Sequence, residues 1–160
     1  LDATQVGALT TTQMRSLSTT QVANIDAAQV SSFTTTQLTQ LSGTQLKALS
    51  TSNLSALDTT QMASLTTTQV GGLTTTQLAG LSVTNLSALD QTQMGQLSTT
   101  QVKALTTAQA ATLSTAQLAG LTTAQMHEHL ARELADGKPV WSVGNDASGY
   151  CSPELRTLGG

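Results

Sequence analysis

The sequence has few of the residues that build charged or aromatic binding surfaces. Of its 160 residues, only 9% are charged and 2% are aromatic, and the formal net charge is −3. Nucleic-acid binding relies on clustered Lys and Arg, and a membrane-surface helix relies on a basic polar face, so we expect neither. No apolar run approaches the length of about 18 residues that a transmembrane helix needs.

Cysteine and the usual catalytic signatures are also scarce. Cys151 is the only cysteine, so no internal disulfide can form, and a lone thiol without a His or acid partner is usually idle. There is no G-x-S-x-G motif, and the glycine pairs at 71–72 and 159–160 are too short to cradle a phosphate. We therefore predict no enzymatic activity, no catalytic or cofactor-binding residue, and no cofactor.

One cluster of metal-ligand residue types occurs, at His127, Glu128 and His129. It is not the H-E-x-x-H zinc signature, because the fifth residue is Ala131. On a helix, residues i and i+2 point in different directions, so the two histidines would chelate poorly; on a strand they would share a face. We predict solvated residues at a helix end and no metal site.

What the sequence has in abundance is one eight-residue repeat. Sixteen octads follow one another over residues 1–128 without insertion or deletion, for example LTTTQMRS, LSTTQVAN and FTTTQLTQ. Position 1 is Leu, Ile or Phe, and position 2 is always Ser, Thr or Asp. Position 5 is always Gln or Asn, and position 6 is Leu, Val or Met with Ala110 as the one exception.

These positions together describe the start of a helix. Ser, Thr and Asp are preferred N-cap residues. A Gln three residues after the cap reaches back to the backbone N–H of the cap and completes a capping box, while the apolar residues before the cap and at position 6 form a hydrophobic staple. Because the combination recurs in phase, we predict one short helix in each octad, over positions 3 to 8.

A break in every octad is needed because neither regular structure fits the period. Eight residues advance about 800° along an α-helix, so the apolar stripe would wind around one long helix. In a strand, positions 1 and 6 would point to opposite faces. Helices this short are unstable alone, so we predict an all-α solenoid or superhelix in which successive octads stack. A β-solenoid is the alternative, because Thr and Val favour strands.

A longer period of four octads is superposed on the repeat. Asp26, Asp58 and Asp90 are 32 residues apart, and Asn53 and Asn85 share that interval. Duplication history accounts for this period. A sharper hypothesis is that four octads complete one superhelical turn, which predicts that octads n and n+4 lie in register. The methionines at position 6 stand where Leu and Val stand elsewhere, so we predict that they fill the core.

The octad pattern stops after the sixteenth repeat, which predicts two regions. Residues 1–128 form the repeat solenoid, and residues 129–160 form a non-repeat C-terminal capping segment. Residues 127–136 have the spacing of an amphipathic helix. Repeat arrays need a cap over their last apolar face, and we predict Trp141 and Leu155 as the side chains that plug it.

The motif L-[ST]-T-[TA]-Q-[LVM] over residues 1–128 resembles the LTTxQ-type octapeptide tandem repeats of large secreted or surface proteins of proteobacteria. The resemblance implies an extracellular or cell-surface location and a structural role. Because the chain starts in repeat phase with Leu1, we expect it to be a piece of a longer array. Residues 129–160 resemble no family.

The uniform array, the low charge and the lack of a site predict a non-enzymatic structural repeat protein. It would be an extracellular filament subunit or the stalk of a surface protein. We expect self-association, end-to-end or lateral, or contact with neighbouring segments of a longer chain. The alternative is a binding platform for a protein, a glycan or ice, in which Thr at positions 3 and 4 faces outward and Arg15, Ser16, Lys47 and Lys103 mark the contact face.

Overall fold

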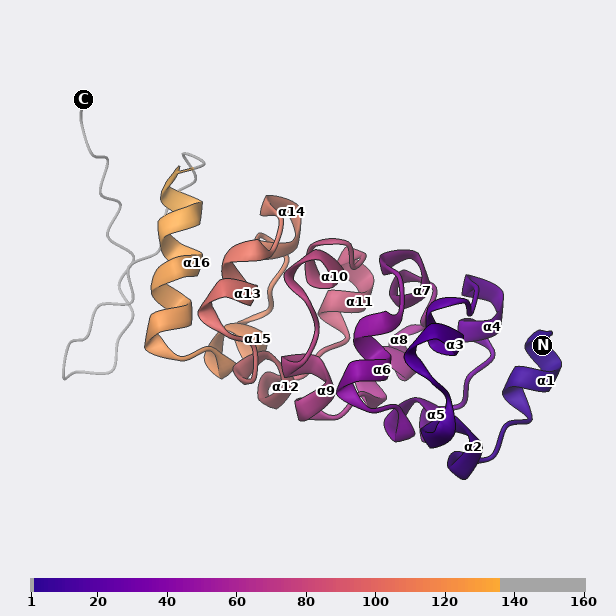
Figure 1. Cartoon of the computed structure of the whole chain (residues 1–160). Coiled ribbons are helices and arrows are strands. Elements are labelled where there is room, and N and C mark those ends of the chain that lie inside the picture. Colours follow the sequence, from indigo (N-terminus) through magenta and orange to yellow (C-terminus); the bar gives the residue numbers. More distant parts are fainter. Residues whose placement is uncertain (1, 136–160) are drawn as a thin grey trace, which may run out of the picture.

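The chain folds into short helices that follow one another around a common axis (Figure 1). The structure, a computed structural model, describes residues 2–135. Within these residues each octad contributes one helix and there is no strand, which confirms the predicted all-α solenoid over the β-solenoid alternative. The helices are α1 (Ala3–Gly7), α2 (Thr11–Ser16), α3 (Thr19–Ala23), α4 (Ala27–Ser31), α5 (Thr35–Gln40), α6 (Gly43–Ala48), α7 (Thr51–Ser55), α8 (Thr59–Ser64), α9 (Thr67–Gly71), α10 (Thr75–Ala79), α11 (Val83–Ser87), α12 (Gln91–Gly95), α13 (Thr99–Ala104), α14 (Thr107–Ala110), α15 (Thr115–Gly120) and α16 (Thr123–Ala135).

Each helix begins directly after its predicted cap. In α1 to α15 the position-2 residue has extended backbone angles, and its side chain accepts a hydrogen bond from the backbone N–H of position 5. The reciprocal bond, from the cap N–H to the position-5 side chain, completes the capping box in every one of these helices except α7 and α11. The caps therefore place a helix start every eight residues, as the sequence predicts.

The chain leaves each helix in the same way, which makes the array regular. The N–H of the next position-1 residue donates to the position-6 carbonyl, as Leu9 does to Val6 (3.1 Å) and Leu49 does to Leu46 (3.2 Å). Where position 1 is the helix C-cap, as at Leu17, its backbone is extended. Because every octad makes the same helix and the same extended turn, successive octads are rotated alike and generate a superhelix.

The superhelical turn is shorter than four octads. Helices three octads apart pack side by side, as in the pairs α3 with α6, α10 with α13, and α12 with α15. The position-5 side chains reach slightly further, to the end of the helix four octads earlier, as Gln69 does to Leu38. The hypothesis that octads n and n+4 lie in register is therefore wrong: one turn takes between three and four octads.

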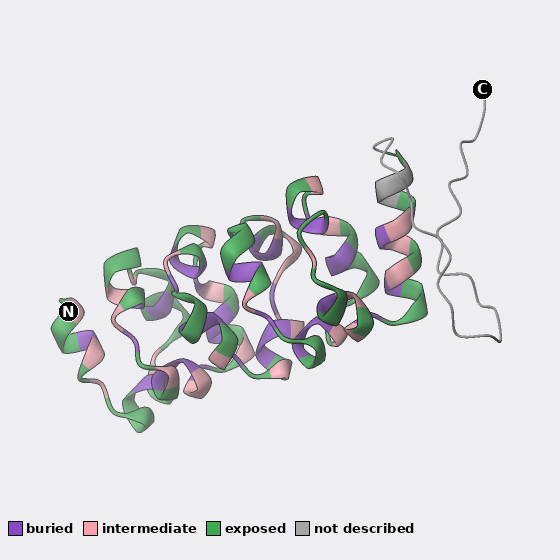
Figure 2. Ribbon diagram, turned by 180° about the vertical axis from the view of Figure 1, so that it is seen from behind, coloured by how far each residue is buried: buried purple, intermediate pink, exposed green. Residues whose placement is uncertain are grey.

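The core is a continuous column along the axis. It holds position 6 of each octad from Val6 to Val102 and position 1 from Phe33 to Leu105, all of them buried (Figure 2). Met14, Met62 and Met94 are fully buried at position 6, which confirms their predicted role as core residues. Each octad thus contributes two apolar side chains, and the caps keep these side chains on the inner side.

Neighbouring turns meet through positions 7 and 8. Position 7 of one octad faces position 8 three octads later, 25 residues along the chain. Gly95 and Gly120 form one such pair, and a Cβ at Gly95 would lie 2.8 Å from the Gly120 carbonyl oxygen. In other pairs a longer side chain spans the gap: Arg15 donates to Gln40, and Lys103 lies 3.7 Å from Glu128. Positions 7 and 8 therefore form a contact between neighbouring turns, made by glycines in some pairs and by longer side chains in others.

The last helix departs from the pattern. α16 runs for 13 residues, through the sixteenth octad and onward, and packs against α13 and α14. It includes residues 127–135 of the amphipathic segment that the sequence predicts and crosses residue 128, the predicted end of the solenoid. The predicted plugs Trp141 and Leu155, and Cys151, lie outside the described residues. None of the helices between residues 2 and 135 has the length and apolar character needed to cross a bilayer.

Candidate functional site

The side chain at position 5 has two roles, of which the capping box is only one. While the Gln37 Oε1 accepts from the N–H of its own cap, Thr34, its Nε2 donates to the carbonyls of Gly7 (3.0 Å) and Leu9 (2.7 Å) in the preceding turn. Every position-5 residue after it makes an equivalent bond, 28 to 31 residues back. We call this series the glutamine ladder; its members are Gln37, Gln45, Asn53, Gln61, Gln69, Gln77, Asn85, Gln93, Gln101, Gln109, Gln117 and Gln125.

The ladder supplies what the ends of short helices lack. The last carbonyls of a helix receive no hydrogen bond from an N–H of that helix. In helices as short as these, such carbonyls are a large share of all the backbone carbonyls. Gln77 donates to the carbonyls of Leu46 (3.0 Å) and Leu49 (2.8 Å), where one octad passes into the next. Each ladder amide is buried, with 6% exposure or less. Each ladder Gln uses both its oxygen and its nitrogen, which offsets the cost of burying it.

Two octads have a position-5 side chain that keeps the bond to the preceding turn but does not complete the capping box. Asn53 and Asn85 are one methylene shorter than Gln, and neither completes the capping box. Both keep the bond between turns: the Asn53 Nδ2 donates to the Ile25 carbonyl (2.7 Å) and the Asn85 Nδ2 to the Leu54 carbonyl (3.1 Å). The contact with the preceding turn is therefore the feature common to all members of the ladder.

Sequence reasoning identified the box and missed the ladder, although a signal was present. A capping box accepts Glu as readily as Gln, because it needs only a side-chain oxygen. The sixteen octads have Gln at fourteen position-5 sites, Asn at two and Glu at none. Only an amide carries a donor together with the oxygen, so this strict choice indicates a second partner.

In the first three octads, α1 to α3, the described residues contain no earlier turn for the ladder to reach. Gln5, Gln13 and Gln21 still accept from their own caps, at 2.8 to 2.9 Å. Their side chains are exposed, and their Nε2 groups have no acceptor among the described residues. The N-terminal end of the described residues therefore carries a row of three exposed glutamine amides.

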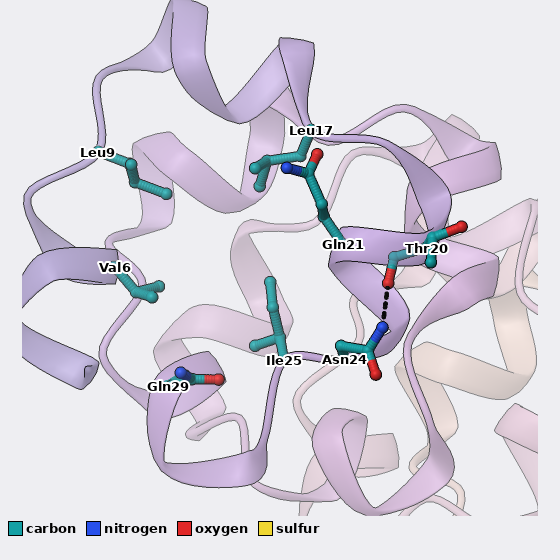
Figure 3. Close-up of a pocket in the computed structure, with 8 residues that line it drawn as sticks. All are labelled: Val6, Leu9, Leu17, Thr20, Gln21, Asn24, Ile25 and Gln29. Atoms are coloured by element: carbon teal, nitrogen blue, oxygen red, sulfur yellow. Dashed lines mark hydrogen bonds between the residues drawn. The ribbon is translucent and has the colours of Figure 1, made fainter. Parts of the chain in front are cut away.

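A cavity of about 320 Å³ opens at the same end (Figure 3). The side chains of Val6, Leu9, Leu17 and Ile25 point into a common space. Polar groups complete the rim: Thr20, Gln21, Asn24 and Gln29. Asn24 is held by its own helix, since its Nδ2 donates to the Thr20 carbonyl (2.8 Å). The arrangement is apolar in the middle with amides around it, which suits a packed protein segment better than a charged ligand.

The residues that the sequence singled out do not gather at this opening. His127 is exposed on α16, Glu128 pairs with Lys103, and His129 is buried. No group of three or more His, Cys, Asp or Glu side chains that could hold a metal occurs among the described residues. Two of the four residues predicted to mark a binding face, Arg15 and Lys103, are exposed and also contact the neighbouring turn of the solenoid.

Comparison with known proteins identifies the repeat in one part of the chain. A family model described as the ALTTAQ repeat matches residues 43–75. This segment lies within the predicted array, so it supports the prediction of a repeat region. No curated protein and no solved structure matches the chain.

Proposed function

We propose that this chain is a non-enzymatic structural module, an extended solenoid that serves as an extracellular filament subunit or as the stalk of a surface protein. The observation that carries the proposal is the glutamine ladder. Twelve successive octads use their position-5 amide in the same way, to bind one turn to the previous one. Because every octad uses its buried amide to hold neighbouring turns together, the interior suits an elongated structural protein.

A repeat of this kind is suited to bearing load along its axis. Stability in a solenoid is close to a sum of unit terms and neighbour interfaces, and here every neighbour interface combines apolar packing with a buried hydrogen bond. The two termini of the described part lie at opposite ends of the solenoid (Figure 1). Adding octads would therefore lengthen the rod without changing its cross-section.

An extracellular or cell-surface location accords with the composition. The chain has one cysteine in 160 residues and few charges, and its exposed surface is covered by neutral hydroxyls. Expression of the full reading frame in its own host, followed by separation of medium, surface and cytosol fractions, tests the location. Recovery of the protein from the cytosol alone would contradict it.

Electron microscopy of the purified protein, paired with small-angle scattering over a range of concentrations, tests the structural role. We expect elongated particles, which associate into filaments if the chain is a subunit and stay as single rods if it is a stalk segment. A maximum dimension that matches a compact globule at every concentration would contradict both forms of the proposal.

A binding platform is the second candidate, supported by the exposure of position 4. This position is exposed in all sixteen octads, and it is Thr or Ser in all but four of them. The result is a regular array of hydroxyl groups on the outer surface. Glycan-array binding and ice-affinity purification test this candidate, and the absence of a signal in both would leave the structural role alone.

A further inference from the structure

Octad 14, residues 105–112, differs from the other octads at position 6. It has Ala110, whereas the other fifteen octads have Leu, Val or Met there. Leu105, the apolar residue before its cap, is fully buried, at 0% exposure, but an alanine methyl is too short to form the second half of the hydrophobic staple. α14 is also the shortest of the helices that the structure describes, with four residues. Octad 14 therefore keeps its cap and box but has less apolar contact to hold it.

The helix on which α14 stacks lacks another part of the same helix start. α14 packs against α11, three octads earlier, and α11 has Asn85 at position 5 and no complete capping box. The contact between α11 and α14 is among the smallest between neighbouring turns, whereas α12 with α15 and α13 with α16 make the largest. Two incompletely stabilised helices thus face each other at one place in the array.

The outer edge of this contact is exposed to solvent. Position 3 of one octad lies against position 8 three octads later, as where the Ser32 hydroxyl donates to the Ala3 carbonyl (2.9 Å). The corresponding residues of octads 11 and 14 are Val83 and Thr112. Among the side chains that the structure describes, Val83 is the one large apolar group that remains exposed, at 36%, and Thr112 is exposed as well. The Thr112 hydroxyl donates to the Gln109 carbonyl of its own helix (2.9 Å) rather than across the contact.

The octads on either side of octad 14 are held without it. α13 packs on α10 and α15 packs on α12, while α16 packs on α13 as well as on α14. Octad 13 has its own ladder bond, from Gln101 to the Leu73 carbonyl (2.6 Å). Octad 15 has another, from Gln117 to the Leu86 carbonyl (2.9 Å). Octad 14 depends on the ladder bonds of Gln109 and on its small contact with α11.

We propose that octad 14 is a built-in opening point of the solenoid. α14 separates from α11 by local unfolding and the ladder bonds of Gln109 break, while the octads before and after it stay bound to the preceding turn. Proteins open in local units whose free energies follow the contacts that they contain, and octad 14 combines a missing staple with a partner helix that lacks its box. A rod of repeats thereby has a compliant site at a fixed place. The inference goes beyond the proposed structural role, because it concerns one octad and holds for a rod in any location.

Amide hydrogen exchange of the full chain, resolved by residue with NMR spectroscopy, tests the proposal. The position-6 amides compare directly, because Leu46, Ala110 and Leu118 each donate to the carbonyl of their own cap at 2.9 Å. After correction for intrinsic rates, we expect the Ala110 amide to exchange at least tenfold faster than both leucine amides. Leu118 lies nearer the C-terminal end of the described residues, so fraying from that end would make its amide the faster one.

Replacing Ala110 by a larger side chain should close the opening point. Ala110→Leu restores the missing staple and should slow exchange of the amide at residue 110 at least tenfold, because it supplies the apolar contact that the other octads have. Ala110→Val uses a residue that five other octads have at position 6. It replaces the leucine variant if circular dichroism shows that Ala110→Leu has lost helix content.

Leu46→Ala is the matched control, because it places an alanine at position 6 of octad 6, where the leucine is 1% exposed. It should speed exchange of the amide at residue 46 at least tenfold and leave that of residue 110 unchanged. An Ala110 amide as slow as that of Leu46, a Leu118 amide faster than that of Ala110, or a rate at residue 110 that neither Ala110→Leu nor Ala110→Val slows would each overturn the opening point. Elongated particles with even exchange along the array would leave the proposed structural role standing.

Discussion

The first turn and the turns that follow consist of the same octad repeat, but the position-5 and position-1 side chains are buried to different extents. In α2 and α6 the capping box is complete, with the same groups in the same roles. Gln13 in the first turn is nevertheless exposed, whereas Gln45, four octads later, is 4% exposed. The comparison shows that the helix start is a local property of the octad, whereas burial of its amide and its leucine depends on the preceding turn.

The largest expected change in the free energy of unfolding comes from replacing a buried ladder amide, compared with the same replacement in the first turn. Gln45→Glu keeps an oxygen for the cap N–H but sets a carboxylate against the carbonyls of Met14 and Leu17. We expect it to lower the free energy of unfolding by about 3–5 kcal/mol, as for an unpaired buried charge. Gln13→Glu, whose side chain faces solvent, should change it by less than about 0.5 kcal/mol. Urea denaturation followed by circular dichroism measures both; equal losses would show that the ladder contributes nothing beyond capping.

Replacing the position-1 leucine by alanine compares how much apolar burial contributes to stability in a later turn and in the first turn. Leu49 is 2% exposed and Leu17 is half-buried beside the cavity. Leu49→Ala should cost about 2–5 kcal/mol, because it leaves a cavity that its neighbours cannot fill. Leu17→Ala should cost about 1 kcal/mol, because its side chain already borders open space. The same denaturation experiment tests this, and a cost for Leu17→Ala as large as that for Leu49→Ala would mean that the first turn is already covered.

Adding a methyl group tests the close approach of neighbouring turns. Gly95→Ala would bring a Cβ to 2.8 Å from the Gly120 carbonyl oxygen, and backbone cannot move aside as a flexible side chain can. We expect a loss of about 1–3 kcal/mol. The matched control is Gly43→Ala at the start of α6, where nothing lies within 4 Å of the new atom. It should stabilise the chain by up to about 1 kcal/mol. Thermal melts of the two variants that shift in the same direction would contradict this account.

The smallest expected effect comes from restoring the missing box in α7. Asn53→Gln adds the methylene that lets one amide reach both its cap and the Ile25 carbonyl, so we expect a gain of about 0.5–1 kcal/mol, comparable to a cap hydrogen bond. In the first turn the reverse change, Gln21→Asn, removes a box with no bond between turns to retain and should cost a similar amount. Melting temperatures of the two single variants provide the check; destabilisation by Asn53→Gln would show that the octad is too tightly packed for the longer side chain.

The local part of the fold could be read from particular residues. Ser18 and Gln21 predict the start of α3, and the structure has that helix begin at Thr19 with a complete box. The bonds involved span three residues, so the sequence alone contains both partners. The amphipathic helix after residue 126 was likewise predictable from its spacing, although the structure joins it to the sixteenth octad as a single α16.

The candidate site could not be read in the same way, because its partners are distant in sequence. The ladder connects residues 28 to 31 apart, and the pairs at positions 7 and 8 connect residues 25 apart. The 32-residue period suggested four octads to a turn, but periodicity reports similarity between octads and carries no information on the rotation between them. That rotation depends on the backbone angles where one octad passes into the next, and the residue types there do not specify those angles closely.

The sequence by itself determined that the chain makes one capped helix in every eight residues and carries two apolar side chains in each. Cap, box and turn are short-range interactions whose partners lie within one octad, so they form alike in every repeat. Only the tertiary structure decided that between three and four octads complete a turn, that the position-5 amide binds the preceding turn, and that positions 7 and 8 of neighbouring turns face one another. Those features depend on how one turn lies on another, and the physical reason is that an octad this short reaches its full burial only when another turn is stacked against it.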